Sequence, residues 1–295
     1  MKKTLAITWI LTLAIAASAF AQSYSVSYSD GTVELKTAKG WSALSVGDLV
    51  PASSSVLVSQ GGSLELTRGA ARITILRDGV YEIASLARAA QKAGAAGTGA
   101  RISQKLQSLT TEQPKSTAAG GVRAEDQGST PTVTWAEESD ETRSEVISLL
   151  AQKKYAEAAK ELEKALDESP STSDGQELMY LSGLAYYGAG QLVKAYRILS
   201  RISPDPGASW YEKYLLLKAQ VLVDSPDFET ALGILQPFLS AHPTGETAQL
   251  AWLLTYYCQK GLGNASAARA ALDAGYQLDP GSETARLIDQ QRTAP

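Results

Sequence analysis

Hydrophobic and polar residues alternate along residues 24–86 in short runs. The alternation is clearest at 24–28, 33–36, 64–67 and 80–83. Turn-forming pairs separate the runs, with Asp-Gly at 30–31 and 78–79 and Gly-Gly at 61–62. Alternation places every second side chain on one face of a strand, and such pairs favour tight turns. The pattern predicts a small all-β sandwich or roll over residues 22–87.

The pattern changes in the C-terminal half to a repeat of 36 or 37 residues. Its markers are alanines at positions 158, 195, 231 and 268. A proline follows twelve residues after three of these alanines, at 170, 243 and 280, and the second unit has Pro204 and Pro206 instead. A fixed period in this range is typical of helical hairpins that must stack to bury their apolar faces. The sequence therefore predicts an α-solenoid of about four hairpins over residues 139–292, and the fold class α+β with two domains.

The repeats resemble the tetratricopeptide repeat family. Residues 154–159 (Lys-Tyr-Ala-Glu-Ala-Ala), followed by Leu162 and Ala165, are similar to its second helix, and Gly183 with Tyr186 is similar to its first. The period here exceeds the family's usual value of about 34 residues, which we place in the turns. The resemblance implies a concave groove, lined by the first helices, that binds a protein partner.

The resemblance also implies which side chains face that groove. Only three of them are basic and none is asparagine, so a clamp for a peptide carboxylate is not favoured. Aromatic and aliphatic residues suit an apolar strip of a protein partner. The alternative is that these aromatics pack between helices or against a capping helix at 283–291. The expected groove residues are Arg143, Ile147, Tyr180, Leu184, Tyr187, Lys213, Leu216, Gln220, Leu253, Tyr257 and Lys260.

The predicted β domain resembles the FecR-type domain of exported bacterial proteins. The similarity lies in Gly31-Thr32-Val33, in Trp41, in Val46-Gly47-Asp48 and in the later Gly-Val-Arg at 121–123. It implies a non-catalytic module of the cell envelope. A second possible function is binding of peptidoglycan, with Trp41 as a stacking surface.

Residues 88–138 are expected to form an insertion in the β domain or a linker. Residues 89–100 are rich in alanine and glycine, with too little apolar surface to order themselves. Ile102, Leu106 and Leu109 could form one helical face. Strands could return near 120–124 and at 133–135.

The N-terminus has the pattern of a secretory signal. Lys2 and Lys3 precede an apolar run at 5–17, and Ala19 and Ala21 have the small-x-small spacing of a cleavage site. We expect residues 1–21 to be removed and the protein to be periplasmic. The alternative is that the signal is retained as an anchor.

Composition limits the chemistry. The net charge of −4 disfavours nucleic acid as a partner. Cys258 is the only cysteine, so an internal disulfide cannot form, and His242 is the only histidine. We expect Cys258 to be a packing residue and His242 to lie at a helix end. We expect no cofactor and no metal, and a non-enzymatic adaptor. Cleavage of glycans by paired carboxylates is the less favoured alternative.

Overall fold

The computed structural model describes residues 23–93, 102, 104–110, 135–168 and 173–293. The expected signal at 1–21, the possible strand at 120–124 and Pro170 lie outside these residues. Eight strands come first, followed by helices. The strands are β1 (Ser23–Asp30), β2 (Val33–Thr37), β3 (Gly40–Ala43), β4 (Leu49–Pro51), β5 (Ser55–Val58), β6 (Ser63–Arg68), β7 (Ala71–Ile75) and β8 (Gly79–Glu82). The helices with assigned bounds are α2 (Ile83–Ala93), α4 (Trp135–Ala151), α5 (Tyr155–Glu168), α6 (Ser173–Gly188), α7 (Leu192–Ser200), α8 (Tyr211–Asp224), α9 (Phe228–Ala241), α10 (Gly245–Leu262), α11 (Ala265–Leu278) and α12 (Glu283–Arg292).

The strands form two four-stranded antiparallel sheets, in the orders β4-β1-β6-β7 and β3-β2-β5-β8. Alternating side chains from both sheets share one core, with Val26 and Leu66 from the first and Val56 and Val58 from the second. The expected all-β arrangement is therefore present. Glycine is required where two turns meet, because a Cβ on Gly31 would lie 2.8 Å from the Cα of Gly62.

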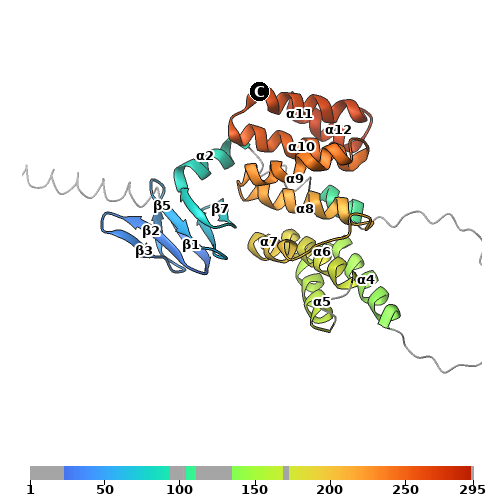
Figure 1. Ribbon diagram of the computed structural model, residues 1–295, viewed down its shortest axis with the longest axis horizontal. Coiled ribbons are helices and arrows are strands. Elements are labelled where there is room, and N and C mark those ends of the chain that lie inside the picture. Colours follow the sequence, from blue (N-terminus) through green and yellow to red (C-terminus); the bar gives the residue numbers. More distant parts are fainter. Residues whose placement is uncertain (1–22, 94–101, 103, 111–134, 169–172, 294–295) are drawn as a thin grey trace, which may run out of the picture.

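The helices from α4 onward form successive antiparallel pairs, and each packs against the next in the chain (Figure 1). The four marker alanines are buried at the helix contacts, as the repeat predicts. Gly183 lets α6 approach α7 closely, since a Cβ there would lie 2.6 Å from Leu199 Cδ2. The helix expected at 283–291 is α12, which packs against α10 and α11.

The segment after the β strands differs from expectation. Residues 83–93 form helix α2, so the expectation that the alanine-rich composition prevents order is wrong for 89–93. Neighbouring elements supply the missing apolar surface. Ile83 belongs to the core of the β sheets, whereas Ala89 and Ala93 pack in the core of the last helices, mainly against α10. Trp135 was expected in a strand and instead begins helix α4.

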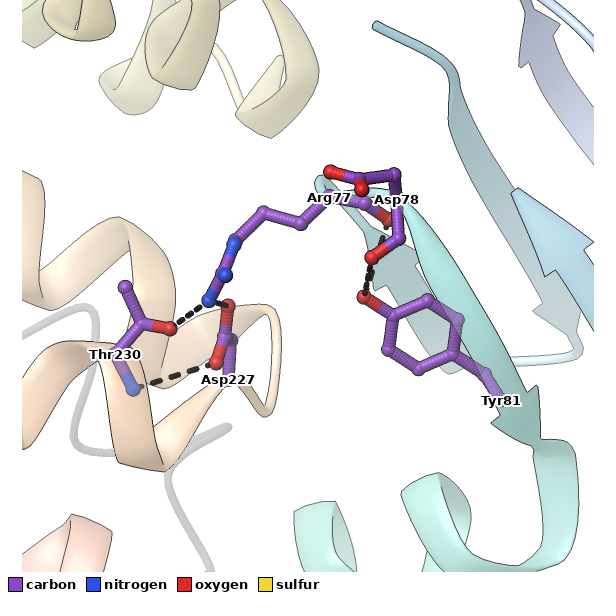
Figure 2. Close-up of polar contacts among 5 residues, drawn as sticks. All are labelled: Arg77, Asp78, Tyr81, Asp227 and Thr230. Atoms are coloured by element: carbon purple, nitrogen blue, oxygen red, sulfur yellow. Dashed lines mark hydrogen bonds and ion pairs between the residues drawn. The ribbon is translucent and has the colours of Figure 1, made fainter. Parts of the chain in front are cut away.

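Three arginines connect the strands to the helices. Arg77 Nη1 lies 3.2 Å from Asp227 Oδ2 and also donates to Thr230 Oγ1, at the start of α9 (Figure 2). Arg197 of α7 pairs with Asp30, and the Arg72 guanidinium donates to the carbonyl of Gly190 at 2.9 Å. Asp227 is also the N-cap of α9, since its side chain accepts from the Thr230 backbone N–H. The β sheets are thus fixed beside α7 and α9.

Candidate functional site

The candidate site is the surface formed by the first helix of each pair, namely α4, α6, α8 and α10. Most of the expected groove residues on these helices are buried. Arg143 is exposed, and Ile147, Lys213 and Lys260 are partly exposed. The seven buried residues are Tyr180, Leu184, Tyr187, Leu216, Gln220, Leu253 and Tyr257.

A short helix of the same chain covers part of this surface. Residues 104–110 are helical; together with Ile102 we call them the groove helix. Ile102 and Leu106 are each 1% exposed, and both belong to the core that α8 and α10 build around Leu216 and Leu253. Ile102 and Leu106 are four residues apart, a spacing that places two side chains on one face of a helix. The expectation of a helical face at 102–109 is therefore confirmed.

The polar side chains of the groove helix reach the first two helix pairs. The Gln107 amide donates to the carbonyl of Leu150, at the end of α4, and accepts from the Tyr155 hydroxyl at 3.0 Å. Thr110 Oγ1 and the Tyr180 hydroxyl share a hydrogen bond of 2.7 Å. The last carbonyls of a helix lack partners within it; the Leu150 carbonyl accepts from the Lys153 backbone N–H at 2.9 Å, and Gln107 adds a second donor to it.

A lysine connects the same segment to the last helices. Lys105 Nζ lies 2.7 Å from Glu246 Oε1, in the first turn of α10, and 3.1 Å from Glu283 Oε2, in the first turn of α12. Burial opposes the charge on Lys105, but the hydrogen bonds to the two carboxylates outweigh it and raise the pKa of this lysine. Its side chain is only 13% exposed. The polar side chains of the groove helix therefore contact the first, second and fourth helix pairs and α12.

The aromatic residues of the site pack mainly against each other. Tyr180 stacks on Trp210 with 5.6 Å between ring centroids, and Trp210 meets Tyr214 edge to face. Burial raises the pKa of Tyr180 above its usual value. The alternative in which the aromatics pack between helices thus describes Tyr180, while its hydroxyl still faces the groove helix.

A cavity of about 840 Å³ is lined by the β4-β1-β6-β7 sheet, by α2, by Gln104 of the groove helix and by the helices from α5 to α8. Asp224, at the end of α8, lines it and accepts a hydrogen bond of 2.6 Å from the Tyr187 hydroxyl. Burial raises the pKa of Asp224 to about 6, although the bond from Tyr187 acts in the opposite direction. This carboxylate was not singled out in the sequence, where nothing distinguishes it from a surface aspartate.

The single cysteine and the single histidine both have structural roles. Cys258 is buried in the core of α10, and burial raises the pKa of its thiol to about 12. Only the thiolate is a strong nucleophile, so this thiol is a packing residue, as expected. His242 caps the end of α9, where its Nδ1 lies 2.9 Å from Glu212 Oε1 and its ring stacks on Phe238.

Comparison with known families bears on the helical part. Residues 149–221 match the family model of the tetratricopeptide repeat. The match runs from the end of α4 into α8, and together with the helical C-terminal region it supports a tetratricopeptide repeat protein. Such repeats generally mediate protein–protein interaction, which is consistent with an adaptor. No curated protein matches the chain. Among the described helices none is both long and apolar enough to cross a membrane.

Proposed function

We propose that the protein is an exported, non-enzymatic adaptor of the bacterial cell envelope that holds a partner protein in the groove of its tetratricopeptide repeats. The observation that supports the proposal is the groove helix, because it packs on this surface through both apolar and polar contacts. The repeat match supports the protein-binding part. The charged start, apolar run and small-x-small site at residues 2–21 support export.

The experiment is photo-crosslinking in cells from two positions on the groove side. Ile147 of α4 and Lys213 of α8 are expected groove residues and are partly exposed, so each can carry a photoreactive residue without opening a core. Lys164 of α5 is exposed on a second helix and serves as the matched control. We expect one protein adduct to appear from both groove positions and to be absent from Lys164. Equal labelling from all three positions, or none with the folded protein in the periplasmic fraction, would refute the groove assignment.

A second candidate function rests on Trp41. It lies on β3, an edge strand whose four residues are all exposed, and is itself 40% exposed. An indole this accessible can stack on a sugar ring, so the alternative is that the β domain binds peptidoglycan. Replacing Trp41 by alanine should then abolish co-sedimentation with isolated sacculi. Equal sedimentation of the two proteins, or none of either, would exclude this function.

A further inference from the structure

The groove helix has the geometry of a bound ligand that is part of the chain. Its apolar side buries Ile102 and Leu106 in the core that also contains side chains of α8 and α10. Its polar side donates to a helix-end carbonyl and reaches the Tyr155 and Tyr180 hydroxyls. Groups of this kind recognise a peptide helix in a groove, where apolar anchors supply most of the affinity and polar contacts fix the register.

We propose that the groove helix (Ile102 and residues 104–110) is an internal occupant of the groove, and that the partner protein binds by replacing it with an amphipathic helix of the same pattern. This inference rests on the proposed function and names the class of its partner. The occupant is chemically specific: two branched aliphatic residues four positions apart, a cation between them and an amide directly after the second.

Each feature of the occupant corresponds to a complementary group in the groove. The aliphatic pair belongs to the same buried core as Leu216 of α8 and Leu253 of α10, which are both fully buried. The cation meets Glu246 and Glu283, so a partner with an acidic residue at that position would leave three carboxylates together. The Gln107 amide donates to the Leu150 carbonyl and accepts from the Tyr155 hydroxyl.

The occupant is also held weakly enough to exchange. A helix as short as residues 104–110 is marginal in water by itself, because nucleation is costly. Only two aliphatic side chains, Ile102 and Leu106, are fully buried within it. Lys105 is itself mostly buried, but its partners Glu246 and Glu283 are 36% and 70% exposed, so water screens both ion pairs from the carboxylate side. A partner that offers the same contacts through a longer helix can compete with it.

The test measures binding of a fluorescein-labelled peptide with the sequence of residues 100–112 to the full-length protein. The host is the double variant Ile102→Ser/Leu106→Ser, which loses both anchors. Gln104→Ser is the matched control, because Gln104 belongs to the same helix and is exposed. We expect the double variant to bind the peptide at least about tenfold more tightly than the wild type or the control, because occupancy by the internal segment reduces the apparent affinity. A peptide carrying both serine substitutions should not bind.

Two results would overturn the proposal. The first is equal peptide affinity of the wild type and the folded double variant, or no binding by that variant. The second comes from hydrogen exchange on the unaltered protein, which decides the matter even if the double variant does not fold. We expect the amides of 104–110 to exchange at least about tenfold faster than those of the middle of α10, because the groove helix leaves without global unfolding. Equal exchange rates would make it a fixed part of the core.

These outcomes separate the inference from the proposed function. A partner that crosslinks from Ile147 but does not compete with the peptide would refute replacement while the adaptor function stands. Peptide exchange without any crosslinked partner would leave an exchangeable segment and refute the adaptor.

Discussion

Two glycines inside helices should respond to the same substitution with opposite signs. A Cβ on Gly183, in α6, would lie 2.6 Å from Leu199 Cδ2 and 2.7 Å from its Cγ. Leu199 is fully buried, so it cannot move away freely. A Cβ on Gly233, in α9, would meet nothing within 4 Å, and this residue is exposed. Replacing a helical glycine by alanine gains about 0.5–1 kcal/mol where there is space.

The magnitudes follow from these distances. Gly183→Ala has the same propensity gain but forces overpacking, which costs about 1–3 kcal/mol. We expect it to lower the free energy of unfolding by about 0.5–2 kcal/mol, and we expect Gly233→Ala to raise it by about 0.5–1 kcal/mol. Urea unfolding followed by circular dichroism measures both.

A second background, Leu199→Ala, tests whether the contact with Leu199 is the cause. Leu199→Ala removes the atoms that the new methyl group would meet, at its own cost of about 2–5 kcal/mol. In that background Gly183→Ala should become neutral or stabilising. If Gly183→Ala stabilises the wild-type protein, or destabilises both backgrounds equally, close packing of α6 on α7 is not the reason for this glycine.

Three further predictions concern local features. Lys153 has a left-handed backbone with φ of 60°, so Lys153→Gly should raise the free energy of unfolding by about 1 kcal/mol in urea denaturation. The Ser282 hydroxyl caps α12 by accepting from the Ala285 N–H at 2.9 Å and also donates to Gln249 Oε1 at 2.8 Å. Ser282→Ala should therefore lower the free energy of unfolding by at least about 1 kcal/mol in thermal unfolding, and an unchanged midpoint would contradict the cap. The pKa of Asp224 is raised to about 6, so the folded state binds this proton more tightly and stability should rise as pH falls from 7 towards about 4. Asp224→Asn should remove that rise and add about 1–2 kcal/mol to the free energy of unfolding at pH 7, since the amide oxygen can still accept from Tyr187. Identical pH profiles of stability for the two proteins would refute the prediction.

The sequence predicted the parts whose periodicity is local. Alternation with Asp-Gly and Gly-Gly turns located the strands, and the marker alanines located the helix contacts, because both patterns depend on near neighbours in the chain. The role of Gly183 was visible for the same reason.

Contacts between distant segments were not predictable in this way. Helix α2 is ordered by α10, and the groove helix by α8 and α10, so their stability depends on partners more than 100 residues away. Gln107 and Lys105 carry ordinary polar side chains, and only the fold brings them to Leu150 and Glu246. The family resemblance placed the expected groove residues on α4, α6, α8 and α10, yet it could not show that a segment of the same chain shares the core of Leu216 and Leu253.

The groove helix changes how the repeats depend on one another. In a linear stack each hairpin contacts only its neighbours, so stability is a sum of local terms and the ends can fray independently. Here a single short helix bonds to Leu150 near the start of the stack and to Glu283 near its end. These contacts join the first helix pair to α12, so unfolding of either end should destabilise the other. Since residues 102–110 are synthesised before every repeat, the array can close only after α12 has emerged from the ribosome. Closure of the array thus waits for the synthesis of α12, and any partner that replaces the groove helix must connect the same two ends.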